Sequence, residues 1–341
     1  MQARRSKVPR GALRSRLRRR LVRATLAGAA LAAMAGTRAQ SSSAPKRIGF
    51  LASDSMSTKL HEGFRTGLRE VGLVEPRQVT IEWRFAEGRY ERLPALAREL
   101  VKLDVDVLVA STALAVQATR QATPRIPIVM IAVPDPVGEG FASSLSRPNG
   151  NITGLSSNVT EASGKHVELM NAVVPKLARA AILINPQNPS DALILEQVQG
   201  AAYSRGIKVL PFEASRTGEI DAAFAAMARQ RVEGVIVAAD PFFDVQWDQV
   251  AALAARHWLP SIFSSHGAVD AGGLMSYGQD LAQHYRRAAG YVDRILHGAK
   301  PANLPIEQPT MLELVVNLRV ARAIGVAVPS ELRVRADRLV E

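Results

Sequence analysis

Cysteine is absent from this chain of 341 residues. Its absence excludes a disulfide framework, a thiolate metal site and a thiol nucleophile. It also excludes the attachment of a lipid to a cysteine behind a leader, so we expect no lipid anchor. Aromatic residues are scarce as well, at 5% of the chain. Any chemistry therefore depends on hydroxyl, amide, carboxylate and imidazole groups.

Acidic residues are absent from positions 1–39, which hold eleven of the 43 Lys and Arg residues. The rest of the chain has 32 basic against 31 acidic residues, so the formal net charge of +12 comes almost entirely from the N-terminus. A nearly neutral body gives no general attraction for polyanions. We therefore expect no nucleic-acid partner.

Apolar runs long enough to cross a membrane are also missing. The basic start is followed by Ala24–Gly36, which is shorter than the roughly 20 residues that a spanning helix needs. This pattern is typical of a secretory signal peptide, which we assign to residues 1–39, with Gln40 as the first mature residue. Arg18–Arg23 also resembles a twin-arginine export pattern. We expect a periplasmic protein; the alternative is a basic arm that is not removed.

Strand and helix patterns alternate through the rest of the chain, which predicts an α/β fold. Predicted strands at 46–52, 79–85, 105–110 and 128–133 form one series, and those at 180–184, 207–211, 234–239 and 260–264 form another. The turn-rich residues 147–151 lie between the two series. We predict lobe 1 from 46–154 plus 278–308, and lobe 2 from 155–277 plus 309–341.

The chain is organised around residues 127–157, where a predicted buried strand, Ile128–Val133, is stopped by Pro134. Asp135 then stands where it could cap a helix beginning at Pro136. A strand end beside a helix N-terminus offers free N–H groups to an anion, so the sequence predicts a binding crevice here.

Polar residues recur at the predicted carboxyl ends of the strands, where open α/β sheets bind ligands. Hydroxyls at Ser111 and Thr112 suit a carboxylate, and Asp240 suits an ammonium, with Asp54 and Asp135 as the next candidates. The alternative is that many of these residues only cap helices or form turns. The predicted ligand-binding residues are Ser53, Ser55, Ser111, Thr112, Asp135, Asn185, Asp240 and Tyr277; Asn188 and Ser276 belong to the same strand ends.

Catalytic motifs are missing. The six histidines form no HExxH pair, and neither a GxSxG elbow nor a P-loop occurs. Gly138–Gly140 only weakly matches a dinucleotide loop. We therefore predict no enzyme, no metal and no cofactor. Phe242, Phe243 and Trp247 could stack on an aromatic ligand or belong to a helix core.

Several segments together resemble the ABC-transporter substrate-binding family whose members bind aromatic amino acids such as tryptophan. The resemblance covers about residues 46–340 and is carried by RIGFLAS, VTIEWRFAEGRYERLPALARELV, DVLVAST, PIVMIAVPDPVGEGFASSLSRPNGNITGLS, ILINPQNP, AADPFF, AGGLMSYG and LPIEQPTMLELVVNLRVARAIG.

This resemblance implies a type I periplasmic-binding-protein fold, with two Rossmann-like lobes that have parallel sheets and are joined by three crossovers. Hinges would fall near 154–155, 277–278 and 308–309. It implies a monomer that binds a small molecule, an amino acid or related carboxylate, and delivers it to an ABC permease in the inner membrane. The alternatives are a ligand-sensing effector domain, which would need a helix-turn-helix ahead of the first strand, and an α/β hydrolase or transferase, which would need a nucleophile and a base.

Overall fold

The computed structural model describes residues 44–55, 58–308 and 311–341. The predicted signal peptide, residues 1–39, lies outside these ranges and stays a prediction. Within them, no helix is both long enough and apolar enough to cross a membrane.

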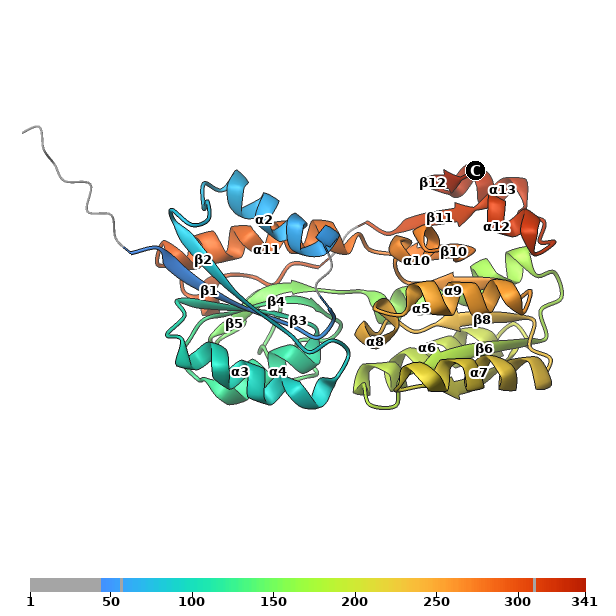
Figure 1. Ribbon diagram of the computed structural model, residues 1–341, viewed down its shortest axis with the longest axis horizontal. Helices are drawn as coiled ribbons and strands as arrows, with labels where there is room; N and C mark the ends of the chain where they lie inside the picture. The colour runs from blue at the N-terminus through green and yellow to red at the C-terminus, as the bar shows by residue number, and fades with distance from the viewer. Residues whose placement is uncertain (1–43, 56–57, 309–310) are drawn as a thin grey trace, which may run out of the picture. The chain divides into compact units, whose positions relative to one another are not determined.

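The first sheet has five parallel strands in the order β2-β1-β3-β4-β5. Helices α2 and α11 cover one face, and α3 and α4 cover the other (Figure 1). We call this sheet and its helices lobe 1. The bounds are β1 Lys46–Ala52, α2 Thr58–Glu70, β2 Val79–Phe85, η1 Tyr90–Arg92, α3 Leu93–Lys102, β3 Val107–Ser111, α4 Ala113–Ala122, β4 Ile128–Val133, β5 Ile152–Ser156, α11 Leu281–Leu296 and η2 Pro301–Asn303.

Both faces of this sheet are apolar, as the continuous hydrophobic runs of its strands predict. Successive side chains of a strand point to opposite faces, so Ile48 and Phe50 pack under α2 and α11, whereas Leu51 packs toward α3 and α4. All three side chains are fully buried. The carboxyl ends of the strands are therefore the exposed edge at which polar residues can gather.

Two glycines set the close approach of α2 to α11. A Cβ on Gly67 would lie 2.1 Å from the backbone oxygen of Arg286, and one on Gly63 would lie 2.7 Å from the oxygen of Ala282. Contacts this short leave no room for any side chain. The two helices can pack backbone to backbone only because both positions lack a Cβ.

Gly67→Ala should therefore lower the free energy of unfolding by about 1 to 3 kcal/mol, because the added methyl group forces α2 away from α11. The matched control is Gly290→Ala on α11, where nothing lies within 4 Å of the added atom. That variant should be neutral or slightly stabilising, since alanine favours a helix. Urea unfolding of both variants tests the packing, and equal effects would contradict it.

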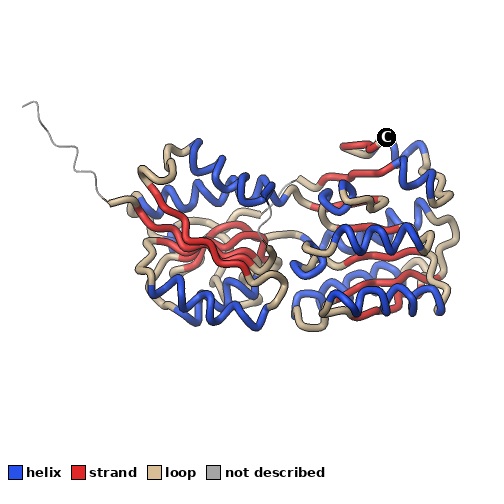
Figure 2. The backbone as a smooth tube through the Cα atoms, viewed as in Figure 1, coloured by secondary structure: helices blue, strands red, loops and turns tan. Residues whose placement is uncertain are grey.

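The second sheet has seven strands in the order β12-β11-β10-β9-β8-β6-β7 (Figure 2). Neighbouring strands are parallel except β10 and β11, which are antiparallel. We call this sheet and its helices lobe 2. The bounds are α5 Val159–Val173, β6 Arg179–Ile184, α6 Pro189–Tyr203, β7 Lys208–Glu213, α7 Thr217–Arg229, β8 Gly234–Val237, α8 Pro241–Asp244, α9 Trp247–Arg256, β9 Ser261–Phe263, α10 His266–Asp270, β10 Met275–Gly278, β11 Glu313–Asn317, α12 Leu318–Ala323, α13 Ser330–Arg335 and β12 Arg338–Val340.

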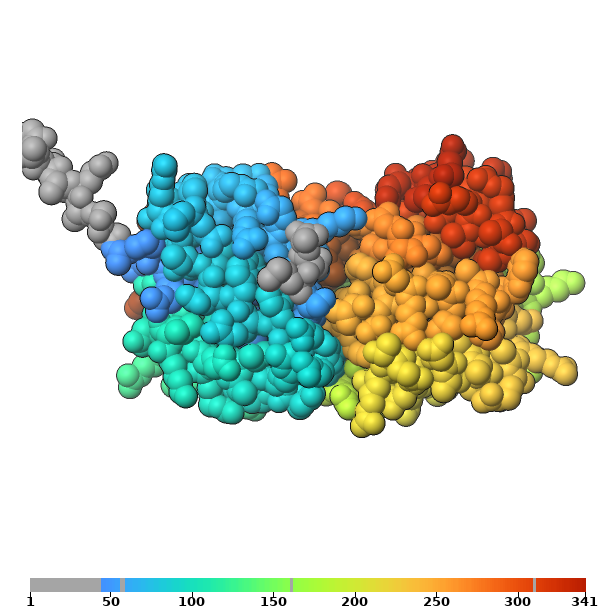
Figure 3. Space-filling model, viewed as in Figure 1, coloured from blue at the N-terminus to red at the C-terminus, as the bar shows by residue number. Residues whose placement is uncertain are grey.

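Strand β6 shows how this sheet divides its core. Ala180 and Ile182 pack with α5 and α6, whereas Ala181 and Leu183 pack with α7 and α9. The C-terminal elements extend the sheet beyond β10, and in the space-filling view their red residues lie against the orange residues of the same lobe (Figure 3).

The chain passes between the two sheets three times: after β5, after β10, and between η2 and β11. Two of these passages run side by side, because Ser156 donates its N–H to the oxygen of Glu307 at 2.8 Å and Glu307 donates to Gly154 at 3.0 Å. At the remaining passage, which follows β10, the backbone carbonyl oxygen of Tyr277 accepts a hydrogen bond from Nε2 of His166 at 2.7 Å. Burial lowers the pKa of His166 to about 4, so this imidazole is neutral. The predicted lobe boundaries and hinges stay predictions.

The α/β fold class with two sheets is confirmed, and most elements agree with the predicted ranges. The prediction of a helix after Asp135 is wrong. Residues 136–140 form turns instead, and Asp135 Oδ1 accepts the N–H of Gly138 at 2.8 Å. Gly140, with a φ of 69°, continues the turn. The side chain of Ser265 caps the short helix α10 by accepting the N–H of Gly267, and strand β10 follows this helix.

Candidate functional site

A pocket lies at the carboxyl ends of strands from both sheets and encloses about 800 Å³, part of it open to solvent. Its walls are mostly apolar, with a few polar groups among them. The lining residues are Thr112, Ala113, Leu114, Ala132, Pro134, Ser157, Asn158, Val159, Ala162, Asn188, Ser190, Ala239, Pro241, Asp244, Ser264, Tyr277, Gly278, Gln279 and Leu281.

The backbone is strained at two lining residues. Thr112 has φ 78° and ψ 158°, a region that only glycine occupies readily, and Ala132 has a φ of 57°. Such a conformation costs on the order of 1 to 3 kcal/mol and tends to occur where a site needs a particular geometry. The Thr112 hydroxyl is held by the hydroxyl of Ser53, with 2.7 Å between the oxygens. The hydrogen bond with Ser53 therefore holds the Thr112 side chain at the start of α4, where the backbone has this unusual conformation.

Two helices begin at the pocket without a side-chain cap: α4 after Thr112 and α5 after Asn158. The first N–H groups of a helix have no partner within the helix and carry partial positive charge. Ser157 Oγ and Asn158 Oδ1 are buried and have no hydrogen-bond partner among the described residues. Lobe 1 and lobe 2 thus each present a helix N-terminus suited to an anion.

Asp244 is the acidic residue of the pocket wall. Burial raises its pKa well above the usual range, and the nearby charges of Asp54 and Asp240 raise it further. Asp54, at the end of β1, is 8% exposed, and burial raises its pKa to about 7. Asp244 thus presents a carboxyl group to the pocket beside its apolar walls.

Asp240, predicted to take an ammonium, is fully buried and does not line the pocket. Its oxygens accept hydrogen bonds from the Tyr90 hydroxyl at 2.7 and 2.8 Å, and from Nδ2 of Asn188 at 2.7 Å. Asn185 Nδ2, at 3.2 Å, and the N–H of Phe242, at 2.8 Å, complete the set. These four donors leave no acceptor position toward the pocket. Tyr90 belongs to lobe 1, so Asp240 joins the two lobes.

The other predicted residues divide into three groups. Thr112 and Tyr277 line the pocket, as does Asn188. Ser53 and Ser111 are buried at the adjoining strand ends, where Ser53 bonds Thr112. Ser55, Asp135 and Asn185 do not line it: Asp135 is exposed in its turn, and Asn185 is bonded to Asp240. Ligand contact by any of these residues stays a prediction.

The aromatic side chains after Asp240 belong to the core. Phe242 and Phe243 are buried within the hydrophobic cluster, with Trp247 packed against it, and none of the three lines the pocket. The interpretation as helix core, rather than as a stacking surface, therefore agrees with the structure.

Sequence reasoning missed Ser157, Asn158, Asp244 and Tyr90. Ser157 and Asn158 follow a strand and precede a helix, so the strand-end rule could have found them. Asp244 lies one helical turn after Asp240, and its place in the pocket depends on α8. Nothing in the sequence around Tyr90 indicates a partner 150 positions away.

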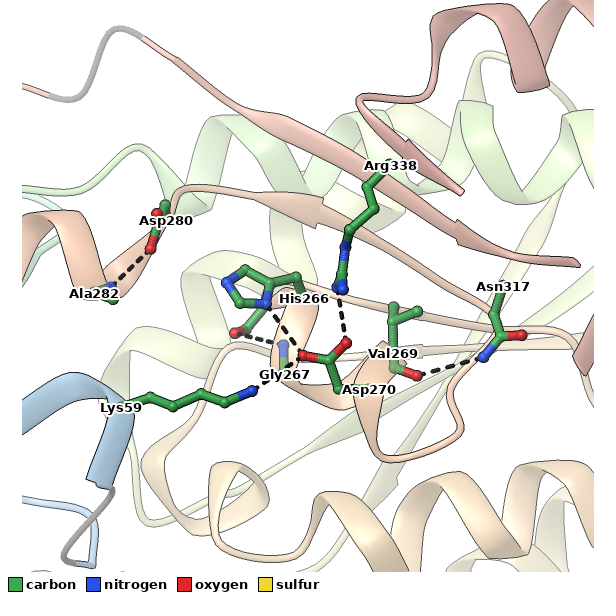
Figure 4. A network of polar contacts seen from close by, with 10 residues as sticks. Lys59, His266, Gly267, Val269, Asp270, Asp280, Ala282, Asn317 and Arg338 are labelled. Atoms are coloured by element: carbon green, nitrogen blue, oxygen red, sulfur yellow. Dashed lines mark hydrogen bonds and ion pairs between the residues drawn. The ribbon is translucent and has the colours of Figure 1, made fainter. Parts of the chain in front are cut away.

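A second contact joins the lobes at the surface. Asp270 of α10 lies between Lys59 of α2, at 3.3 Å, and Arg338 of β12, at 2.9 Å (Figure 4). All three side chains are partly exposed to solvent, so each ion pair contributes little to stability. In the part of the chain that the structure describes, no three His, Asp or Glu side chains are grouped so that they could hold a metal ion.

Comparisons with known proteins indicate one family. The family model described as ABC transporter substrate binding protein matches residues 48–340. A tyrosine-binding protein of Clostridioides difficile (strain R20291) is 24% identical over 259 residues, which are 76% of this chain and 74% of that protein.

Two solved structures are similar over most of the chain. A domain from Streptococcus pneumonia in complex with L-Trp has a TM-score of 0.79 and 25% identity, covering 87% of this chain and all of that one. A conserved domain protein of Vibrio cholerae has a TM-score of 0.80 and 26% identity, covering 86% and 99%.

Proposed function

Because this chain belongs to the family of ABC transporter substrate-binding proteins, we propose that it captures an aromatic L-amino acid between its two lobes and delivers it to an ABC permease in the inner membrane. It acts as a binding protein and catalyses no reaction, in line with its family. It would work in the periplasm after removal of residues 1–39. The observation that carries this proposal is the pocket between strand ends of both sheets, with a helix N-terminus from each lobe.

The carboxylate of the ligand would lie between α4 and α5. The first N–H groups of α4, at Ala113 and Leu114, have no side-chain cap and come from lobe 1, and Ser157 and Asn158 add polar groups from lobe 2. Charge-assisted hydrogen bonds to a carboxylate are the stronger kind. Because the donors come from both lobes, a bound carboxylate would stabilise the arrangement in which the lobes approach each other.

The side chain of the ligand would occupy the apolar part of the pocket, among Leu114, Pro134, Val159 and Leu281, with the ring of Tyr277 nearby. Apolar walls of this kind suit an aromatic side chain. The names of two relatives support this class of ligand, since one is a tyrosine-binding protein and another was solved with L-Trp.

Binding of L-tryptophan or L-tyrosine should raise the melting temperature of the mature protein, since a ligand at a hundred times its Kd stabilises the folded state by about 2.7 kcal/mol. Thermal-shift measurements followed by calorimetry test this. myo-Inositol and D-glucose, which lack a carboxylate, serve as controls and should produce no shift. A shift with the controls but with no amino acid would contradict the proposal.

Thr112→Gly separates the role of this residue in the site from its role in the fold. Glycine relieves the strained φ of 78° and should raise the free energy of unfolding. The same change removes the hydroxyl beside the helix N-terminus and should weaken amino-acid binding by about tenfold. Urea unfolding and calorimetry measure the two effects. A variant that is stabilised and binds as tightly as the parent would exclude Thr112 from the site.

A further inference from the structure

We propose that Tyr90 is a positioning residue for the binding site: its hydroxyl, from lobe 1, holds Asp240 of lobe 2 and thereby slows the release of a bound ligand that it does not touch. The inference rests on the proposed function, because it concerns the capture of a small molecule between the two lobes. Neither Tyr90 nor Asp240 lines the pocket, so the protein makes this contact by itself.

The Tyr90 hydroxyl enters a buried polar network whose other members belong to lobe 2. It donates to the two oxygens of Asp240, at 2.7 and 2.8 Å, and accepts the N–H of Phe242 at 3.2 Å. Asp240 also accepts a hydrogen bond from Nδ2 of Asn188 at 2.7 Å, and the same nitrogen lies 3.1 Å from Asp191 Oδ1. Tyr90 is 8% exposed and Asp240 is fully buried. Hydrogen bonds to a buried carboxylate are of the stronger kind.

The lobe 2 wall of the pocket is built around Asp240. Its two neighbours in the chain, Ala239 and Pro241, line the pocket, as do Asn188 and Ser190 at the start of α6. Oδ1 of Asn188 accepts the N–H of Ser190 at 3.1 Å, while Nδ2 of Asn188 donates to Asp240. The contact from lobe 1 therefore ends at residues that shape the lobe 2 side of the site.

On the lobe 1 side, the turn that precedes Tyr90 is anchored close to the pocket. Gly88 donates its N–H to the backbone oxygen of Ser53 at 2.8 Å, and the Ser53 hydroxyl bonds that of Thr112, which lines the pocket. Gly88 also packs against lobe 2, because a Cβ added there would lie 3.3 Å from Cα of Phe242. Tyr90 thus follows a turn that is fixed to one wall of the site and reaches the residue behind the other wall.

A contact between the lobes acts on a ligand through the closed arrangement of the protein. A ligand held between the lobes leaves when the lobes separate, and their separation must also break the hydrogen bonds between Tyr90 and Asp240. Losing one such hydrogen bond should disfavour the closed arrangement by about tenfold. The alternative is an interface that never opens, in which case the hydroxyl contributes to the free energy of unfolding alone.

Tyr90→Phe removes the hydroxyl and keeps the ring. Stopped-flow displacement of L-tryptophan or L-tyrosine from the mature protein should show dissociation about tenfold faster in this variant than in the parent. The dissociation rate is the decisive measurement, because affinity also depends on how far the lobes are closed before the ligand arrives. The effect of Tyr90→Phe should be smaller in an Asp240→Asn background, because an amide oxygen is a weaker acceptor than a carboxylate.

Tyr291→Phe is the matched control. Tyr291 of α11 is buried outside the pocket, and its hydroxyl donates to the oxygen of Pro305 at 2.6 Å, within lobe 1. This variant should lose a similar free energy of unfolding and keep the dissociation rate of the parent. Unchanged dissociation in Tyr90→Phe, or equal acceleration in both variants, would overturn the positioning role and leave the binding function intact.

A second measurement needs no ligand. Because the chain has no cysteine, a pair of dyes can be attached at Lys102→Cys, at the end of α3, and Arg229→Cys, at the end of α7, both of them exposed positions. Single-molecule energy transfer should show separated lobes more often in Tyr90→Phe than in the parent or in Tyr291→Phe. If neither amino acid binds, this distribution decides: a shift supports the contact despite failure of the proposed ligand class, and an unchanged distribution overturns it.

Discussion

Replacing Asp240 with alanine should lower the free energy of unfolding by about 3 to 5 kcal/mol. The carboxylate accepts hydrogen bonds from the Tyr90 hydroxyl, two asparagine amides and the N–H of Phe242, all of them buried. Alanine leaves these donors without an acceptor, and each buried unpaired donor costs about 1 to 3 kcal/mol. Urea unfolding of the ligand-free protein measures the loss.

Two milder variants separate the contribution of the Tyr90 hydroxyl from that of the whole Asp240 carboxylate. Tyr90→Phe removes only the donor from lobe 1 and should cost about 1 to 2 kcal/mol. Asp240→Asn keeps one acceptor oxygen and should fall between Tyr90→Phe and Asp240→Ala. Burial raises the pKa of Asp240, and the neighbouring Asp191 has its pKa raised by burial and by Asp240. Because burial already disfavours the charge of Asp240, a neutral amide is tolerated better than a methyl group.

The Asp240→Ala result also separates two roles of this residue. The sequence pattern suggested Asp240 as the ammonium ligand, which predicts a large loss of affinity in a protein of normal stability. The structure instead predicts a large loss of stability in this variant and a smaller direct effect on amino-acid affinity. A folded Asp240→Ala variant with parental stability and strongly weakened amino-acid binding would contradict the structural role.

Relative to an Asp54→Asn variant, the ligand-free protein should become less stable as the pH rises from about 4 to about 8, by up to roughly 4 kcal/mol from Asp54 alone. The pKa of this carboxyl is about 7 in the folded protein against 3.8 as the usual value, because burial disfavours its charge. The folded state therefore holds a proton that the unfolded state has lost, so Asp54 lowers the free energy of unfolding through that interval. The buried imidazole of His166, whose pKa is lowered to about 4, acts in the opposite direction. Asp244, whose pKa is also raised by burial, acts in the same direction.

Asp54→Asn removes this dependence and should be more stable than the parent at pH 8 but not at pH 4. Unfolding in urea at pH 4.5, 6 and 8, without added amino acid, gives the two profiles. The surface variant Asp248→Asn should follow the parent at each pH. A parent profile that rises with pH, while the Asp54→Asn profile is parallel to it, would show that this carboxyl is ionised in the folded protein.

The binding site was only partly predictable. Thr112 and Tyr277 were found because carboxyl ends of parallel strands meet at one edge of a sheet, and that rule needs only the order of elements. Asp135 and Asp240 satisfied the same rule and still lie outside the pocket, since one ends in an exposed turn and the other is engaged with Tyr90. Position along the chain does not specify which way a side chain points or which donors reach it first.

The sequence by itself determined the alternation of strands and helices, the two sheets and the edge at which polar groups gather, because these depend on local periodicity and on turn residues. It could not determine that β10 and β11 run antiparallel, that α8 and α10 form, or that Tyr90 donates to Asp240 from the other lobe. Those features depend on contacts between residues far apart in the chain. Only the packing of the two lobes decides that Asp240 is satisfied by protein donors while Asp244 lines the pocket.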